Sequence, residues 1–130
     1  MRDKVNIDTN ILFYALNRES PKSEKAKNIL FSARKVDSSI TLRALSECYA
    51  LALKRNSKRK KKARIFVESL NHDTQFNIIS SGKKELDRAL EEDKNFWDRM
   101  IEETALEHGY QVIYTEKTDD FNEIDAINPF

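Results

Sequence analysis

Short apolar segments alternate with helical stretches along the chain, and this alternation restricts the fold more than any other feature of the sequence. Helices that connect successive strands allow the strands to run parallel, with helices covering both faces of the sheet. We therefore expect a three-layer α/β/α fold around a central, mostly parallel sheet of four to five strands. The expected strands are residues 4–8, 36–41, 76–79 and 112–114, with a weaker one at 124–127.

The expected helices follow from apolar residues at helical spacing. Asp8 or Thr9 is a plausible N-cap for the first helix, and Pro21 is expected early in the second, where its missing N–H costs nothing. Gly109 is expected to end the last helix in the C′ position. The expected helices cover residues 11–16, 20–33, 42–53, 63–70, 83–92 and 96–108.

The length of 130 residues is typical of one domain, and we expect a single domain over residues 1–130. No apolar run approaches the roughly 20 residues that span a membrane, and Asp3, Lys4 and Asp8 interrupt any signal-peptide core. Cys48 is the only cysteine, which excludes an internal disulfide. These features favour a cytoplasmic protein.

Several residues that are often catalytic have structural interpretations here. Cys48 is expected in the core, because a free cysteine is commonly buried. His72 and His108 have no evident catalytic partner and are expected at the surface or in structural roles. An apolar stripe on the last long helix is also expected to belong to the core, and it consists of Trp97, Met100, Ile101, Thr104 and Ala105.

Acidic residues stand where a parallel sheet gathers its ligands. Asp8 ends the first strand, and Glu47 and Asp98 lie on amphipathic helices. Carboxylates that meet at the carboxyl end of a sheet suit Mg²⁺ or Mn²⁺, because these cations prefer oxygen ligands. Each residue also has a structural alternative. Asp8 can act as a helix cap, Glu47 can be a solvated helix position, and Asp98 can interact with a helix dipole.

Four motifs in a fixed order carry a family resemblance. They are Val5-Asn6-Ile7-Asp8-Thr9-Asn10-Ile11-Leu12, Ser46-Glu47-Cys48, Phe96-Trp97-Asp98-Arg99-Met100-Ile101 and Tyr114-Thr115-Glu116-Lys117-Thr118-Asp119-Asp120-Phe121. The ordered set resembles the PIN-domain ribonucleases, and the VapC-type toxins of toxin–antitoxin pairs most closely. The resemblance covers essentially the whole chain and includes its end, Asn128-Pro129-Phe130.

This resemblance implies a PIN-like α/β/α domain and an endoribonuclease that depends on Mg²⁺ or Mn²⁺. Asp8, Glu47 and Asp98 match the metal-binding, catalytic carboxylates of the family, and Asn10 and Thr115 match polar positions that line the same pocket. The resemblance also implies a small antitoxin protein as a partner, and a homodimer.

Lys117 departs from the family, which usually carries Asp or Asn two residues after the threonine that Thr115 matches. Asp119 or Asp120 could supply the missing metal-binding, catalytic carboxylate, and Asp120 is slightly favoured. Alternatively the site keeps three acids and binds its second metal weakly, and Lys117 then lines the pocket and places positive charge near the scissile phosphate. Two rivals stay open: a degenerate PIN domain that binds RNA or a protein partner without cleavage, and a receiver-like signalling domain.

A dense basic run lies between residues 54 and 64. It contains eight basic residues and no acid, whereas residues 85–125 carry fourteen acids and four basic residues. Positive charge of this density can bind nucleic-acid phosphates, and a solvated surface is the alternative. The run contains no aromatic residue, so base stacking within it is not expected. The expected RNA-binding residues are Lys54, Arg55, Lys58, Arg59, Lys60, Lys61, Lys62 and Arg64.

Overall fold

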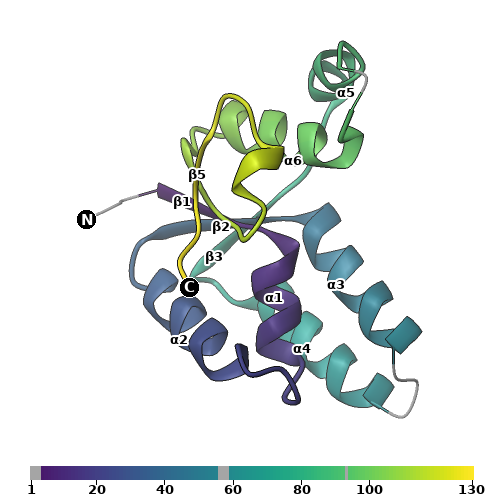
Figure 1. Ribbon diagram of the computed structural model, residues 1–130, viewed down its shortest axis with the longest axis vertical. Coiled ribbons are helices and arrows are strands. Elements are labelled where there is room, and N and C mark those ends of the chain that lie inside the picture. The colour runs from purple at the N-terminus through teal and green to yellow at the C-terminus, as the bar shows by residue number, and fades with distance from the viewer. Residues whose placement is uncertain (1–3, 56–58, 93) are drawn as a thin grey trace.

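The computed structural model describes residues 4–55, 59–92 and 94–130, in which strands and helices alternate (Figure 1). The strands are β1 (Lys4–Ile7), β2 (Asp37–Thr41), β3 (Phe76–Ile79), β4 (Val112–Tyr114) and β5 (Asp125–Ile127). The helices are α1 (Thr9–Leu16), α2 (Ser23–Ala33), α3 (Leu42–Arg55), α4 (Lys60–His72), α5 (Lys83–Ala89) and α6 (Phe96–Glu107), with a 3₁₀ turn, η2, at Thr118–Asp120.

The five strands are parallel and lie in the order β3-β2-β1-β4-β5. The chain builds outward from β1 through β2 to β3, and then adds β4 and β5 on the other side of β1. The strand order therefore reverses between β1 and β4, where Asn6 pairs with Ile113 and Ile7 with Tyr114. In open parallel sheets, ligands bind beyond the carboxyl ends of the strands at this switch point.

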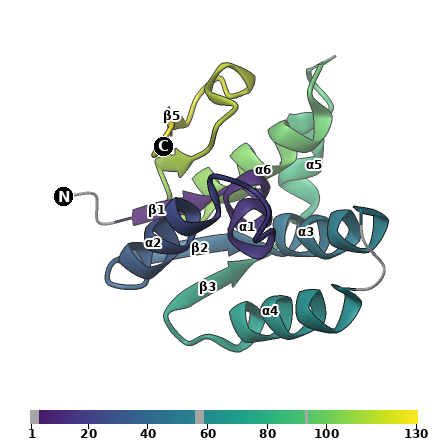
Figure 2. The ribbon, with the colours of Figure 1, turned by 60° about the horizontal axis from the view of Figure 1, so that its bottom comes forward.

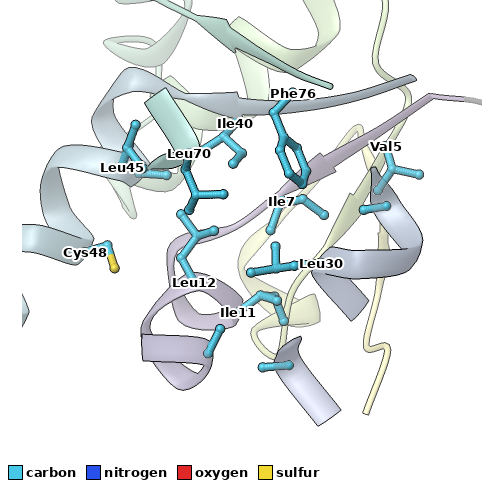
Figure 3. Close-up of a cluster of buried hydrophobic side chains, with 14 residues drawn as sticks. Val5, Ile7, Ile11, Leu12, Leu30, Ile40, Leu45, Cys48, Leu70 and Phe76 are labelled. Carbon is cyan, nitrogen blue, oxygen red and sulfur yellow. The ribbon is translucent and has the colours of Figure 1, made fainter. Parts of the chain in front are cut away.

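Helices cover both faces of the sheet. Helices α1 to α4 lie on one face, and α5 and α6 lie on the other (Figures 1 and 2). Under the first group, Val5 and Ile7 of β1 pack with Ile11 and Leu12 of α1 and with Phe76 of β3 (Figure 3). A smaller apolar cluster separates α6 from the sheet and contains Ile79, Ile101, Ala105, Tyr110, Ile113, Phe121 and Ile124. The expected three-layer α/β/α fold is confirmed.

The side-chain alternation of β1 explains how one strand serves both faces. Val5 and Ile7 belong to the cluster under α1, whereas the intervening Asn6 points to the opposite face. Its Nδ2 donates to Ser39 Oγ of β2 at 2.8 Å, so this buried amide has a partner on the neighbouring strand. Strand β1 ends at Ile7, and the next residue, Asp8, begins the transition to α1 as its N-cap.

Two of the three predicted helix boundaries are confirmed, those at Asp8 and Gly109, and the one at Pro21 is wrong. Asp8 is the N-cap of α1, and its Oδ1 accepts the Thr9 N–H at 2.7 Å. Gly109 follows α6 with a φ of 86°, which glycine adopts without a steric penalty. The expectation that Pro21 opens a helix is wrong, because α2 begins at Ser23. Pro21 lies instead in a turn that the Ser23 N–H closes on the Ser20 carbonyl at 3.1 Å.

The structural interpretations hold for most of the residues concerned. Cys48 is fully buried, and burial, together with the Glu47 charge, raises the pKa of its thiol to about 12. Both histidines are exposed, as expected. The expectation of a core stripe is wrong for Trp97, which is 49% exposed and stacks on Arg43 of α3, and for Met100, which is only partly buried and belongs to neither apolar cluster. In the described ranges, no helix is long and apolar enough to cross a membrane.

Candidate active site

Asp8 is a buried carboxylate at the carboxyl end of β1. Its N–H donates to the Tyr114 carbonyl of β4 at 3.1 Å, which places Asp8 where the strand order reverses. Oδ1 accepts the Thr9 N–H, and Oδ2 accepts the Thr115 hydroxyl at 2.8 Å and the Asn10 amide at 3.2 Å. Three donors therefore hold the Asp8 carboxylate in one orientation.

Asn10 and Thr115 lie in the same hydrogen-bonded network as Asp8. The Asn10 Nδ2 also lies 3.2 Å from Thr115 Oγ1, and the Asn10 Oδ1 accepts the Glu116 N–H at 3.2 Å. Thr115 Oγ1 in turn accepts the Lys117 N–H at 3.0 Å. These bonds join the start of α1 to the segment after β4, which are about a hundred residues apart in sequence.

Asp98 reaches this end of the sheet from the first turn of α6. The residue before the helix, Asn95, has a φ of 54°, a left-handed conformation that asparagine tolerates better than most residues. The Asp98 Oδ1 lies 3.2 Å from the Lys117 Nζ. The Asp98 side chain is mostly buried, whereas that of Lys117 is half-exposed.

Opposing charges set the ionisation of these groups. Burial raises the pKa of Asp8 above its ordinary value, with a smaller contribution from Asp98, whereas the Thr115, Thr9 and Lys117 groups oppose the increase. Burial alone would lower the pKa of Lys117, but the charges of Asp8, Asp98 and Asp120 outweigh it, and the pKa of Lys117 is raised. The Lys117 ammonium thus lies in the field of three carboxylates.

Glu47 is held by a cation of its own helix. Its Oε2 accepts a hydrogen bond from Arg43 Nη2 at 3.2 Å, one turn earlier on α3. The Arg43 guanidinium lies 3.7 Å from the centre of the Trp97 ring, next to Asp98 in sequence. Glu47 is therefore half-buried and paired rather than simply solvated, and Arg43 and Trp97 link it to the start of α6.

Asp119 and Asp120 lie in η2, after β4. Asp119 is exposed, whereas Asp120 is half-buried and close enough to raise the pKa of Lys117. Of these two candidates for the missing family acid, Asp120 is the one that faces the same positive charge as Asp8 and Asp98.

Two buried residues of α6 fix the segment that carries Asp120. The Glu102 Oε2 accepts the backbone N–H groups of residues 122, 123 and 124 at 2.8, 2.7 and 3.0 Å. Arg99 donates to the Asp120 carbonyl, and its Nε lies 3.3 Å from Glu102 Oε1. Sequence reasoning missed this pair, because charges three residues apart on a helix are more often a solvated surface pair.

The oxygen donors of this site suit a hard divalent cation in kind. Within residues 4–55, 59–92 and 94–130, however, no three acidic, histidine or cysteine side chains are grouped closely enough to hold a metal ion. Lys117 pairs with Asp98, and Arg43 pairs with Glu47. Metal binding by this set would therefore require the carboxylates to approach one another, and the cationic side chains to turn away from them.

A comparison with protein families covers nearly the whole sequence: the PIN domain model matches residues 5–127. The chain belongs to the PIN domain family. This membership agrees with the order of the four acidic motifs and favours the PIN interpretation over the receiver-like alternative. No curated protein matches the chain at a significant level.

Solved structures that resemble this PIN domain include bacterial toxins. The Mycobacterium tuberculosis toxin VapC20, described as cleaving the sarcin-ricin loop, is 16% identical with a TM-score of 0.73, over 92% of this chain and 98% of that one. A Klebsiella pneumoniae toxin–antitoxin complex is 25% identical with a TM-score of 0.70, over 97% and 98%. Rickettsia felis VapBC2, bound to promoter DNA, is 19% identical with a TM-score of 0.63, over 95% and 97%.

The described residues of the basic run lie at the ends of α3 and α4 that are remote from the sheet of this PIN domain (Figure 1). Lys54 is seven residues beyond Glu47 on α3, which is about 10 Å along the helix axis. Lys60 is the first residue of α4, and positive charge at the start of a helix is disfavoured by the helix dipole. Local helix stability therefore does not explain why a lysine occupies this position. The exposed members in the described ranges are Lys54, Arg55, Lys60, Lys61, Lys62 and Arg64, and Lys58 lies outside those ranges.

Part of this run is already paired or packed. Arg59 lies 2.8 Å from a Glu19 carboxylate oxygen, and Arg64 lies 2.6 Å from one of Glu68. The Arg55 guanidinium lies 5.7 Å from the centre of the Phe13 ring, beside a cavity of about 360 Å³ at the end of α1 remote from Asp8. The fold thus places an aromatic ring next to the basic run, which the local sequence does not.

Proposed function

We propose that this PIN domain is a metal-dependent endoribonuclease that cleaves RNA phosphodiester bonds and acts as the toxin of a VapBC-type toxin–antitoxin pair. The observation that carries the proposal is the buried Asp8 at the switch point, with Asp98 brought to the same lysine from a distant helix. Family membership and the likeness to toxin structures support the same conclusion.

In this proposal, Asp8 and Asp98 would hold a Mg²⁺ or Mn²⁺ ion, and Glu47 and Asp120 would join them once Arg43 has turned away from Glu47 and Lys117 from Asp98. When bound, such an ion lowers the pKa of a coordinated water and offsets charge on the phosphate oxygens. Thr115 and Asn10 keep the Asp8 carboxylate oriented by donating to its Oδ2. The Arg99–Glu102 pair positions the turn that bears Asp120.

The partners follow from the same reasoning. The K. pneumoniae neighbour is a toxin–antitoxin complex, which supports a small antitoxin protein as the partner of this chain. We further propose a homodimer, a cytoplasmic location and a single PIN-like domain over residues 1–130. A short reading frame next to the gene would support the antitoxin proposal, and co-purification of its product with this chain would test it.

Replacing Asp98 with asparagine is expected to lower RNA cleavage at least about 100-fold, since even groups that only support a metal ligand contribute 10–100-fold. The control is Asp87→Asn, which removes an equal charge from an exposed position on α5. Initial rates on total RNA with Mn²⁺ measure both variants. Equal rates for Asp98→Asn and Asp87→Asn would contradict the proposed site.

The basic run is proposed to bind the RNA backbone. The double variant Lys60→Gln/Lys61→Gln should reduce the slope of log affinity against log salt concentration by about 1.4, at about 0.7 for each lost phosphate contact with a single strand. Lys83→Gln/Lys84→Gln is the matched control, because these lysines open α5 as the first pair opens α4. Fluorescence anisotropy at several salt concentrations measures the slope, and equal slopes for the two variants would exclude the basic run as the RNA contact.

A second candidate function is a degenerate PIN domain that binds RNA or a protein partner without cleaving. The contact between Lys117 and Asp98 favours it, because a lysine there neutralises a carboxylate that the nuclease needs. In that case RNA would bind, but no combination of metal and RNA would give products.

A further inference from the structure

Lys117 is fixed at the acidic site by its backbone as well as by its charge. Its N–H donates to Thr115 Oγ1 at 3.0 Å, and the same hydroxyl donates to Asp8 Oδ2 at 2.8 Å. Its Nζ lies 3.2 Å from Asp98 Oδ1. Lys117 therefore connects the two carboxylates at the switch point. It reaches Asp8 through the Thr115 hydroxyl, and it reaches Asp98 through an ion pair.

We propose that Lys117 is an internal cation that competes with a divalent metal ion for Asp98, so that the metal binds only when the Lys117 ammonium leaves this carboxylate. The inference rests on the proposed function, in which Asp8 and Asp98 hold the metal. It concerns how the site is regulated rather than which reaction it performs.

The physical reason is that two cations cannot share one carboxylate without repelling each other. Carboxylates close together in a partly buried site need positive charge nearby, and an ammonium group provides it when the metal is absent. The side chain of Lys117 is half-exposed, so its Nζ can leave Asp98 without unpacking the core. The metal must therefore displace a cation that the chain itself supplies, and its apparent affinity falls accordingly.

Lys22 offers a matched control, because it lies before α2 but pairs with a residue of the segment that carries Lys117. It forms an ion pair with Glu116, the residue before Lys117, and its side chain is about as exposed as that of Lys117. The Glu116 carboxylate also accepts a hydrogen bond from the Tyr14 hydroxyl at 2.6 Å, away from Asp8. Removing Lys22 thus changes the net charge equally without uncovering Asp98.

The test is a calorimetric titration of the full chain with Mn²⁺, without RNA. Lys117→Met, which keeps the side-chain length but not the charge, should bind Mn²⁺ at least about tenfold more tightly than wild type, or about 1.4 kcal/mol. Lys117→Asp should bind more tightly still, because it adds an oxygen ligand. Lys22→Met should stay within about twofold of wild type, and thermal melts confirm that each variant is folded.

The opposite result would be an Mn²⁺ affinity that is unchanged or weaker in both Lys117 variants, or raised equally by Lys22→Met; either overturns the competition. This outcome is distinct from a failure of the nuclease proposal. Tighter Mn²⁺ binding without RNA cleavage supports the role of Lys117 and removes the nuclease. Metal-dependent cleavage by wild type, with unchanged Mn²⁺ affinity in the Lys117 variants, would support the nuclease proposal and overturn the competition by Lys117.

Discussion

Replacing Glu102 with alanine is expected to lower the free energy of unfolding by about 3–5 kcal/mol, the usual cost of removing one partner from a buried ion pair. Glu102 is 1% exposed and Arg99 is 4% exposed. The substitution leaves the Arg99 guanidinium without its carboxylate and removes the acceptor of three backbone N–H groups, those of residues 122–124. Urea unfolding followed by circular dichroism measures the change.

Glu107→Ala is the control for this prediction, because Glu107 lies on the same helix and pairs with Arg88 at 3.1 Å on the surface. A solvent-exposed ion pair contributes little to stability, so the free energy of unfolding of this variant should stay near that of wild type. A similar decrease in the free energy of unfolding for the two variants would show that the buried Arg99–Glu102 pair stabilises the fold no more than a surface pair does. A large loss confined to Glu102→Ala would confirm that α6 fixes the segment bearing Asp120.

Asp8→Asn is expected to lower the rate of RNA cleavage by at least about 100-fold while the fold persists. Asparagine is as good an N-cap as aspartate, so α1 keeps its start, and the Asn Oδ1 can still accept the Thr9 N–H. The lost activity would therefore report on the carboxylate and not on unfolding. Initial cleavage rates and thermal melts of the same preparation separate the two.

The stability of Asp8→Asn should also depend on pH in a defined direction. Burial raises the pKa of Asp8 above 3.8, so the folded protein holds this proton more tightly than the unfolded chain. Wild type therefore loses stability from Asp8 as pH rises from 3.8 through the folded pKa, and the asparagine variant does not. The stability of Asp8→Asn relative to wild type should increase toward neutral pH; a constant or decreasing difference in urea melts would contradict the raised pKa.

Much of the sheet was predictable from sequence because β3 and β4 are short, mostly apolar runs with clear breaks, whereas β2 reads Asp-Ser-Ser-Ile-Thr and β5 reads Asp-Ala-Ile. Residues 76–79 and 112–114 match β3 and β4 in full, and β1 differs only because Asp8 caps α1 instead of pairing. The meeting of Asp8 with Thr115 was predictable for the same reason, since the carboxyl ends of neighbouring parallel strands share one edge.

The side-chain partners were not predictable, because they depend on distances between elements. Local sequence suggests a solvated Glu47, yet Arg43 holds it and stacks on Trp97. Helix periodicity placed Trp97 in the core, although it is half-exposed. The Lys117 position departs visibly from the family, but only the folded chain shows that its ammonium contacts Asp98.

The most direct measurement of the central claim is RNA cleavage by the purified full chain with Mn²⁺, with Mg²⁺ and with EDTA, beside Asp8→Asn under the same conditions. A metal-dependent endoribonuclease predicts products with Mn²⁺ or Mg²⁺, none with EDTA, and none from Asp8→Asn. Cleavage that persists in EDTA, or is equal in Asp8→Asn, would contradict the account, as would a folded wild-type protein that binds RNA and leaves it intact with either metal.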